Sequence, residues 1–240
     1  MSDQGQDARI NGDGTVVPGT YGTITLNGAG TVTGDVVCRE LKINGAGTCK
    51  GAVRADLVTV NGTGTFDGPV QAGELVANGN VDVRAGVGAG VLKVRGSVST
   101  DGGIHARDID LKGDLRSGGP VKADRLFGEG RFSISGALDA GDIDLRLHGR
   151  SSATEVTCTR MVLRVPEGFS AVFSAFSDRE LAATTVRGGE LELISVVASL
   201  VSGSRVTLGE GCRVGRVEYS ETLQKLGGAL VTEELKVDAG

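Results

Sequence analysis

The chain has 240 residues, of which 40 are glycine and only 3% are aromatic, with no tryptophan. The glycines do not recur at every third residue and there are only four prolines, which excludes collagen and proline-rich linkers. The net charge of -5 comes from 25 basic and 30 acidic residues, a balance that argues against a nucleic-acid-binding protein. This composition allows a core built from small aliphatic side chains.

Residues 1–14 are mostly polar and are predicted to form an N-terminal tail. They show neither the basic start nor the apolar stretch of a secretion signal, and no segment reaches about 18 consecutive apolar residues. The cysteines have no CxxC spacing and are expected to be reduced and buried as small apolar side chains. They are Cys38, Cys49, Cys158 and Cys212. The sequence therefore favours a cytoplasmic protein.

A regular sequence repeat begins near residue 27. Asn-Gly pairs occur at 27–28, 44–45, 61–62 and 78–79, each seventeen positions after the last, and glycines continue the same step at 96, 113 and 130. Two aliphatic rows keep this step and are predicted to be ladders through the core. The first row is Val36, Val53, Val70, Val87, Ile104 and Val121, and the second is Leu41, Val58, Leu75, Leu92, Ile109 and Leu126.

Each repeat contains short segments in which apolar and polar residues alternate, which is the period of a β-strand. No repeat has room for a helix of about ten residues. The recurring glycines are expected at corners where φ is positive. Three short strands and three corners in each repeat predict an all-β fold, a three-sided parallel β-helix over residues 15–226. Equivalent positions of consecutive coils should then stack about 4.8 Å apart.

The repeat loosens after Leu138, whose next equivalent is Val156, one position beyond the regular step. An irregular coil is predicted near residues 169–190, and regular alternation returns from Leu191. Three phenylalanines lie in the irregular segment: Phe169, Phe173 and Phe176. Residues 227–240 are predicted to form a last strand or cap, followed by a short tail.

Few side chains suggest catalysis. Polysaccharide-cleaving β-helices use clustered carboxylates, and the matching set here is Asp108, Asp110, Asp142 and Asp144, at outward positions. Arg125 lies between them in register, which favours an exposed ladder of ion pairs instead. The two histidines, His105 and His148, have no stacked partner and are expected at the solvent-exposed surface. We expect no enzymatic activity, metal or cofactor, and keep a polysaccharide-binding or polysaccharide-cleaving protein as the alternative.

The ends of a β-helix expose unpaired strand edges, which proteins normally cover with a helix, a loop or charges. Neither flank of this sequence is long enough for a substantial helical cap. End-to-end stacking into filaments is therefore expected. Ile24 and Leu26 are the candidate interface residues at the N-terminal end, and Val231, Leu235 and Val237 are those at the C-terminal end.

The repeated coils and the segment GSRVTLGEGCRVGRVEYS at positions 203–220 resemble the bactofilins, bacterial polymer-forming cytoskeletal proteins. The resemblance implies a right-handed β-helix that polymerises end to end without nucleotide, and a cytoplasmic location that includes the inner face of the membrane. It implies a scaffold for cell shape, cell-wall synthesis or motility assembly. The partners implied are further copies of the chain, a paralogous bactofilin and membrane or cell-wall machinery, but no nucleic acid. A surface adhesin is a third hypothesis, disfavoured because no secretion signal is evident.

Overall fold

The computed structural model describes residues 5–165 and 179–238. All regular secondary structure in these residues is β-strand, and the strands pair in parallel about 17 residues apart as a β-solenoid. The predicted all-β fold is therefore confirmed. The chain divides into two compact units, residues 1–119 and residues 120–240, and each is described by itself.

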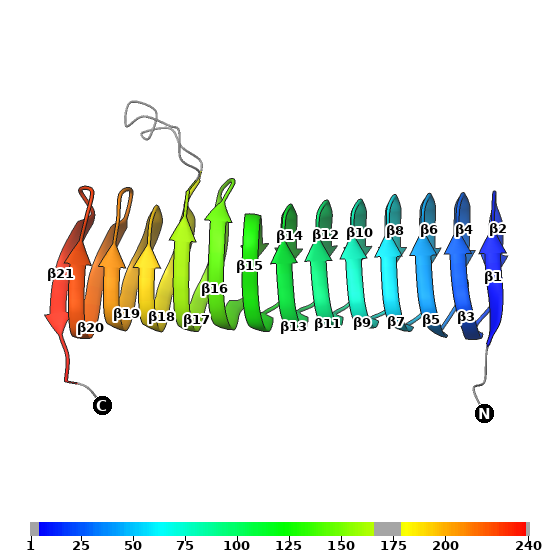
Figure 1. Ribbon diagram of the computed structural model, residues 1–240, viewed down its shortest axis with the longest axis horizontal. Coiled ribbons are helices and arrows are strands. Elements are labelled where there is room, and N and C mark those ends of the chain that lie inside the picture. Colours follow the sequence, from blue (N-terminus) through cyan, green and yellow to red (C-terminus); the bar gives the residue numbers. More distant parts are fainter. Residues whose placement is uncertain (1–4, 166–178, 239–240) are drawn as a thin grey trace. The chain divides into compact units, whose positions relative to one another are not determined.

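In the first unit, each complete coil contains one eight-residue strand and one four-residue strand. The long strands stack on one another, and so do the short ones, as Figure 1 shows between the labels β3 and β14. The strands are β1 (Gln6–Ile10), β2 (Gly14–Val16), β3 (Gly19–Leu26), β4 (Ala29–Val32), β5 (Val36–Ile43), β6 (Ala46–Cys49), β7 (Val53–Val60), β8 (Thr63–Phe66), β9 (Val70–Ala77), β10 (Asn80–Val83), β11 (Val87–Val94), β12 (Ser97–Thr100), β13 (Ile104–Leu111) and β14 (Asp114–Ser117).

Each long strand bends near its middle, which supplies the third side of the coil. In β5 the inward residues are Val36, Cys38, Leu41 and Ile43, so the alternation changes phase after Cys38. The pairing register also skips Arg39, the residue at the bend. The three predicted short segments are therefore present, but two of them belong to one continuous bent strand.

In the second unit, most coils are formed by one long strand. The strands are β15 (Val121–Ile134), β16 (Ala137–Leu147), β17 (Ser151–Arg164), β18 (Leu181–Leu193), β19 (Val196–Leu208), β20 (Arg213–Lys225) and β21 (Leu230–Lys236). Leu138 pairs with Val156, which confirms the predicted lengthening of the step by one position. The strand β21 confirms a last strand within the segment 227–240.

The predicted irregular coil at positions 169–190 is wrong in its second half. Strand β18 begins at Leu181 and pairs in regular register with β17, because its inward residues Leu181, Val186 and Leu191 continue the buried rows. The segment 166–178, which includes Phe169, Phe173 and Phe176, lies outside the described residues.

The predicted N-terminal tail at positions 1–14 is also wrong for its described part. Strand β1 pairs with β3, and β2 pairs with β4, so the segment from β1 to β2 forms a first coil. Ala8 and Ile10 provide the alternation that this strand needs, and they lie over Ile24 and Leu26. The step between these partners is one position shorter than in the repeat, which concealed the coil in the sequence.

Both predicted core ladders are buried. Every one of their twelve residues is at most 3% exposed, which confirms the inward rows in each unit. Burying a side chain of this size contributes about 1.5–3 kcal/mol relative to leaving it in water. The four cysteines are also buried and free of disulfides, as expected.

The glycine of each Asn-Gly pair has a different role from the one predicted. The backbone at Gly45, Gly62 and Gly79 does not adopt a positive φ. A Cβ at these positions would instead lie 2.4, 2.1 and 2.0 Å from the carbonyl oxygen of the equivalent glycine in the preceding coil. The coils approach so closely at this corner that only hydrogen fits, and this approach accounts for the glycine column.

A column of asparagines stands beside these glycines. The Nδ2 group of each donates a hydrogen bond to the Oδ1 atom of the asparagine one coil earlier, at 2.7–2.8 Å. The column contains Asn11, Asn27, Asn44, Asn61 and Asn78, and we call it the asparagine ladder. Because a carboxamide carries both a donor and an acceptor, identical side chains bond to one another along the whole column.

Candidate functional site

The C-terminal end of the second unit is the strongest candidate for a functional surface. Leu230 and Leu235 of β21 are 65% and 38% exposed, and Leu226, directly after β20, is 56% exposed. Val231 and Val237 are half-buried on the same segment. Among the described residues, β21 pairs only with β20 along one edge. The predicted residues Val231, Leu235 and Val237 therefore lie together at an open strand edge.

Among the described residues, β21 covers only part of β20 and leaves part of the core open. Strand β21 pairs with β20 only from Arg213 to Tyr219, although β20 continues to Lys225. Leu223 continues the inward row that contains Leu191 and Val206, each 1% exposed. Leu223 itself is only half-buried, because no described strand covers it. An apolar row of the core thus reaches the surface at this end.

Charged side chains surround this apolar surface. Arg216 lies 3.0 Å from Glu218 and 4.0 Å from Glu233, and Lys225 pairs with Glu234. These pairs are largely exposed, so they contribute little to the stability of the fold. Their arrangement is that of a polar rim around an apolar patch, which is common at protein interfaces.

The N-terminal end of the first unit has a different chemistry. Gln6, Asp7 and Arg9 of β1 are at least partly exposed, and the Asp7 carboxylate accepts a hydrogen bond from the Thr23 backbone amide at 2.7 Å. Ile10 is the largest apolar side chain of this strand and is half-buried. The edge of β1 is therefore mainly polar, although Val17, which follows β2 in the same coil, is 63% exposed.

The predicted interface residues Ile24 and Leu26 are not at this surface, and that prediction is wrong. Both are 0% exposed, because β1 lies over the strand that carries them. Conversely, sequence reasoning missed Leu226 and Leu230. The sequence shows that both residues are apolar. Their exposure, however, depends on the conformation of the corner between β20 and β21, which the sequence does not show.

The predicted carboxylate face does not have the expected character in the first unit. Asp108 is only 6% exposed, so its prediction as an outward residue is wrong, and its carboxylate lies 3.0 Å from the Arg107 guanidinium. Arg107 is the residue at the bend of β13 and forms an ion pair with this neighbouring carboxylate. Asp110 lies 3.4 Å from Arg95. Both carboxylates are therefore engaged by arginines.

In the second unit, arginines accompany the other two carboxylates. Asp142 lies 3.9 Å from Arg160, and Asp144 pairs with Arg164. The Arg125 guanidinium lies 5.9 Å from the centre of the Phe127 ring. All of these groups except Arg164 line a shallow depression of about 240 Å³. Asp142 and Asp144 thus belong to exposed ion pairs with Arg160 and Arg164, whereas the ladder through Asp108, Arg125 and Asp142 stays a prediction.

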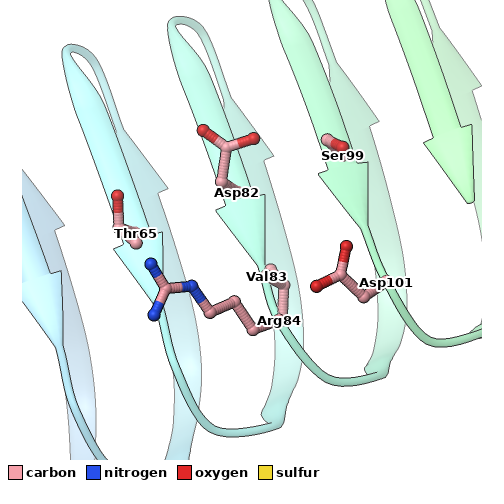
Figure 2. A pocket seen from close by; sticks show the side chains of 6 residues that line it. All are labelled: Thr65, Asp82, Val83, Arg84, Ser99 and Asp101. Carbon is pink, nitrogen blue, oxygen red and sulfur yellow. The ribbon is translucent and has the colours of Figure 1, made fainter. Parts of the chain in front are cut away.

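A second depression lies on the first unit and has a volume of about 330 Å³. Figure 2 shows Arg84 reaching toward Thr65, with the carboxylates of Asp82 and Asp101 on neighbouring coils. Arg84 also pairs with Asp67 at 3.1 Å. The lining residues of this depression include no pairing of a nucleophile with a base. Across positions 5–165 and 179–238, no group of three or more histidine, cysteine or acidic side chains is placed to hold a metal ion.

His105 and His148 lie at the surface, as expected from their positions in the repeat. His148 Nε2 is 3.7 Å from a Glu129 carboxylate oxygen, and His148 is about half exposed. Within the part of the chain that the structure describes, no helix has the length and apolarity needed to cross a membrane.

Comparison with known proteins gives one informative result. No family model matches the chain, and no solved structure matches it. The uncharacterized protein YhbE of Bacillus subtilis strain 168 is 50% identical over 212 residues, which cover 88% of this chain and 90% of YhbE. The name of that protein states no activity. With this identity over nearly the full length of both proteins, the chain belongs to the same family as YhbE.

Proposed function

We propose that the protein is a non-enzymatic scaffold whose copies assemble end to end into filaments. The observation that carries this proposal is the C-terminal end, where exposed leucines adjoin an unpaired strand edge and an uncovered core row. An open parallel edge of this kind is a template for pairing with another chain.

The driving force for such assembly is the burial of apolar surface. Leu226, Leu230 and Leu235 are each more than a third exposed, whereas a fully buried leucine gains about 1.5–3 kcal/mol. Pairing of the free β21 edge would add backbone hydrogen bonds, each contributing about 0.5–1.5 kcal/mol net. Both contributions come from the chain itself, so the proposed assembly needs no bound nucleotide.

The cytoskeletal part of the proposal comes from the bactofilin resemblance. The resembling segment at positions 203–220 covers the end of β19 and most of β20, the strand that borders the open end. We propose a right-handed coil, a cytoplasmic location that includes the inner face of the membrane, and partners drawn from paralogous bactofilins and from membrane or cell-wall machinery. Cell shape, cell-wall synthesis and motility assembly are the processes that such a scaffold would serve.

Electron microscopy of the purified full chain, without nucleotide or metal, tests the assembly. The wild type should form filaments, and Leu235→Arg should abolish them by placing a charge in the apolar patch. Val37→Arg is the matched control, because Val37 is 49% exposed on β5, away from any strand edge. Circular dichroism should show unchanged β-structure in both variants. Filaments of Leu235→Arg, or none in the wild type, would refute the proposal.

The alternative function is polysaccharide binding or cleavage at the outward carboxylates. One observation favours it, the Phe127 ring, which is 38% exposed in a depression beside Asp142 and Asp144. Aromatic rings next to carboxylates suit sugar rings, but here Arg125 already lies over Phe127. Asp142→Asn combined with Asp144→Asn should abolish glycan binding or cleavage if this alternative holds. Unchanged glycan binding in that double variant would dismiss it.

A further inference from the structure

The asparagine ladder contains a chemically reactive sequence at every step. Each of its five asparagines is followed directly by glycine: 11–12, 27–28, 44–45, 61–62 and 78–79. In such a pair, the glycine backbone nitrogen can attack the asparagine Cγ atom, and ammonia leaves as a cyclic succinimide forms. Water then opens the succinimide to aspartate or isoaspartate. Overall, one water is consumed and one ammonia is released, with no change of oxidation state.

We propose that the pair at positions 11–12 is a site of spontaneous deamidation in the folded protein, and that the fold protects the other four pairs. All five asparagines are exposed, so solvent access does not distinguish them. The difference arises from the hydrogen bonds of the ladder and from the stacking of the glycines.

Hydrogen bonds restrain the inner carboxamides on both sides. Asn27, Asn44 and Asn61 each donate to the preceding asparagine and accept from the following one, at 2.7–2.8 Å. Turning such a carboxamide toward the next backbone nitrogen would break both bonds. Asn78 donates to Asn61, and the nitrogen that would attack it is itself engaged, because the Gly79 amide donates to the Val60 carbonyl at 3.2 Å.

The stacked glycines restrain the attacking backbone in the same four pairs. A Cβ on Gly28, Gly45, Gly62 or Gly79 would lie 2.0–2.6 Å from the carbonyl oxygen of the preceding glycine in the column. The backbone at each of these four glycines is therefore packed closely against the preceding coil. A Cβ on Gly12 would meet nothing within 4 Å. The Asn11 side chain also accepts one hydrogen bond, from Asn27, but donates none to a described residue.

The product of the reaction also fits only at the first position. Aspartate at position 11 still accepts the hydrogen bond from the Asn27 amide, and the negative charge strengthens that bond. At an inner position, a carboxylate would face the carboxamide oxygen of the preceding asparagine with no hydrogen between them. The ladder thus accommodates a carboxylate at its start and disfavours it at an inner position.

Peptide mass spectrometry on the aged full-length protein tests the proposal. Arg9 and Arg39 are consecutive trypsin sites, so one peptide, spanning positions 10–39, carries both the candidate pair and the protected pair at 27–28. Fragmentation of this peptide measures both rates in the same sample. Asn11 should deamidate about tenfold or more faster than Asn27, since the protected residue must first break ladder hydrogen bonds.

Two controls separate the fold from the local sequence. In urea, where the ladder is absent, the five rates should converge. In folded Gly12→Ala, deamidation of Asn11 should slow strongly while the ladder stays intact, because the added methyl group hinders attack by that nitrogen and meets no neighbour. Equal rates at Asn11 and Asn27 in the folded protein, the same ranking in urea, or unchanged deamidation of Gly12→Ala would each overturn the proposal.

Discussion

Replacing one stacked glycine by alanine should destabilise the protein strongly, whereas the same change at the start of the column should not. In Gly62→Ala, the new Cβ would lie 2.1 Å from the Gly45 carbonyl oxygen. Real contacts of this kind are longer than 3.0 Å, so the two coils must separate locally by about 1 Å. The hydrogen bonds between these coils are short: Asn61 N to Ile43 O is 2.7 Å and Thr63 N to Gly45 O is 2.9 Å.

Separation by that amount moves both backbone bonds beyond hydrogen-bonding distance and also strains the ladder bond from Asn61 to Asn44. At about 0.5–1.5 kcal/mol for each of these three bonds, the expected loss is about 1.5–4.5 kcal/mol, a large part of the stability of an ordinary domain. Gly12→Ala is the matched control, since its Cβ meets no atom within 4 Å. This substitution should leave the free energy of unfolding unchanged or raise it by about 0.4–1 kcal/mol, because alanine lowers the conformational entropy of the unfolded chain.

Urea denaturation followed by circular dichroism measures both variants. The midpoint should fall clearly for Gly62→Ala and should not fall for Gly12→Ala, with similar slopes in both cases. A stability of Gly62→Ala equal to that of the wild type would refute the argument that close stacking selects glycine at this corner. A loss in Gly12→Ala as large as that in Gly62→Ala would refute it as well.

Three further predictions concern the core, the ion pairs and the thiols. Leu75→Ala should cost about 2–5 kcal/mol in urea denaturation, because Leu75 is 0% exposed and would leave a cavity. Arg205, which pairs with Glu190 and with Glu221 at 3.1 Å, is exposed; Arg205→Ala should lower the melting temperature slightly, and this difference should vanish in high salt. Burial, with smaller contributions from nearby groups, raises the pKa of the Cys49 thiol to about 12. Since the unfolded thiol ionises near pH 9, this group stabilises the fold below that pH and its contribution declines between pH 9 and 12, as denaturation at several pH values can measure.

The repeat made most of the fold predictable. Residues such as Val53 and Val58 recur at a constant step, and alternation within a strand fixes which side chains face inward, so the core rows follow directly. The first coil was not predicted, because the step from Ala8 to Ile24 is one position shorter than the repeat. The irregular segment was predicted to extend too far because the first apolar residues of β18, Leu181 and Val186, follow a long interruption of the repeat.

The candidate site was predictable only in part, because exposure at an end depends on what the chain does next. Leu26 and Leu235 look alike in sequence, yet β1 covers the first completely and no described strand covers the second. Asp108 shows that the exposure of a residue on the side of a coil is also not predictable from its position in the repeat. Its position in the repeat is outward, but in the structure Asp108 is buried and pairs with the neighbouring Arg107. Such local coverage has no periodic signal in the sequence.

The two units solve the same stacking problem with different side chains. Each coil places a side chain directly beside its equivalent in the next coil, where identical charges would repel. In the first unit, the asparagine ladder avoids this repulsion with neutral groups that bond to copies of themselves. In the second, one outward row alternates in sign instead. This row runs through Asp142, Arg160, Glu190 and Arg205. Hydrogen bonds between neutral carboxamides are nearly insensitive to salt, whereas exposed ion pairs are screened by it. The asparagine ladder should therefore depend less on ionic strength than the row of alternating charges. The asparagine ladder and the row of alternating charges therefore both follow from the stacking of equivalent positions in consecutive coils. Neither pattern needs a ligand to explain it.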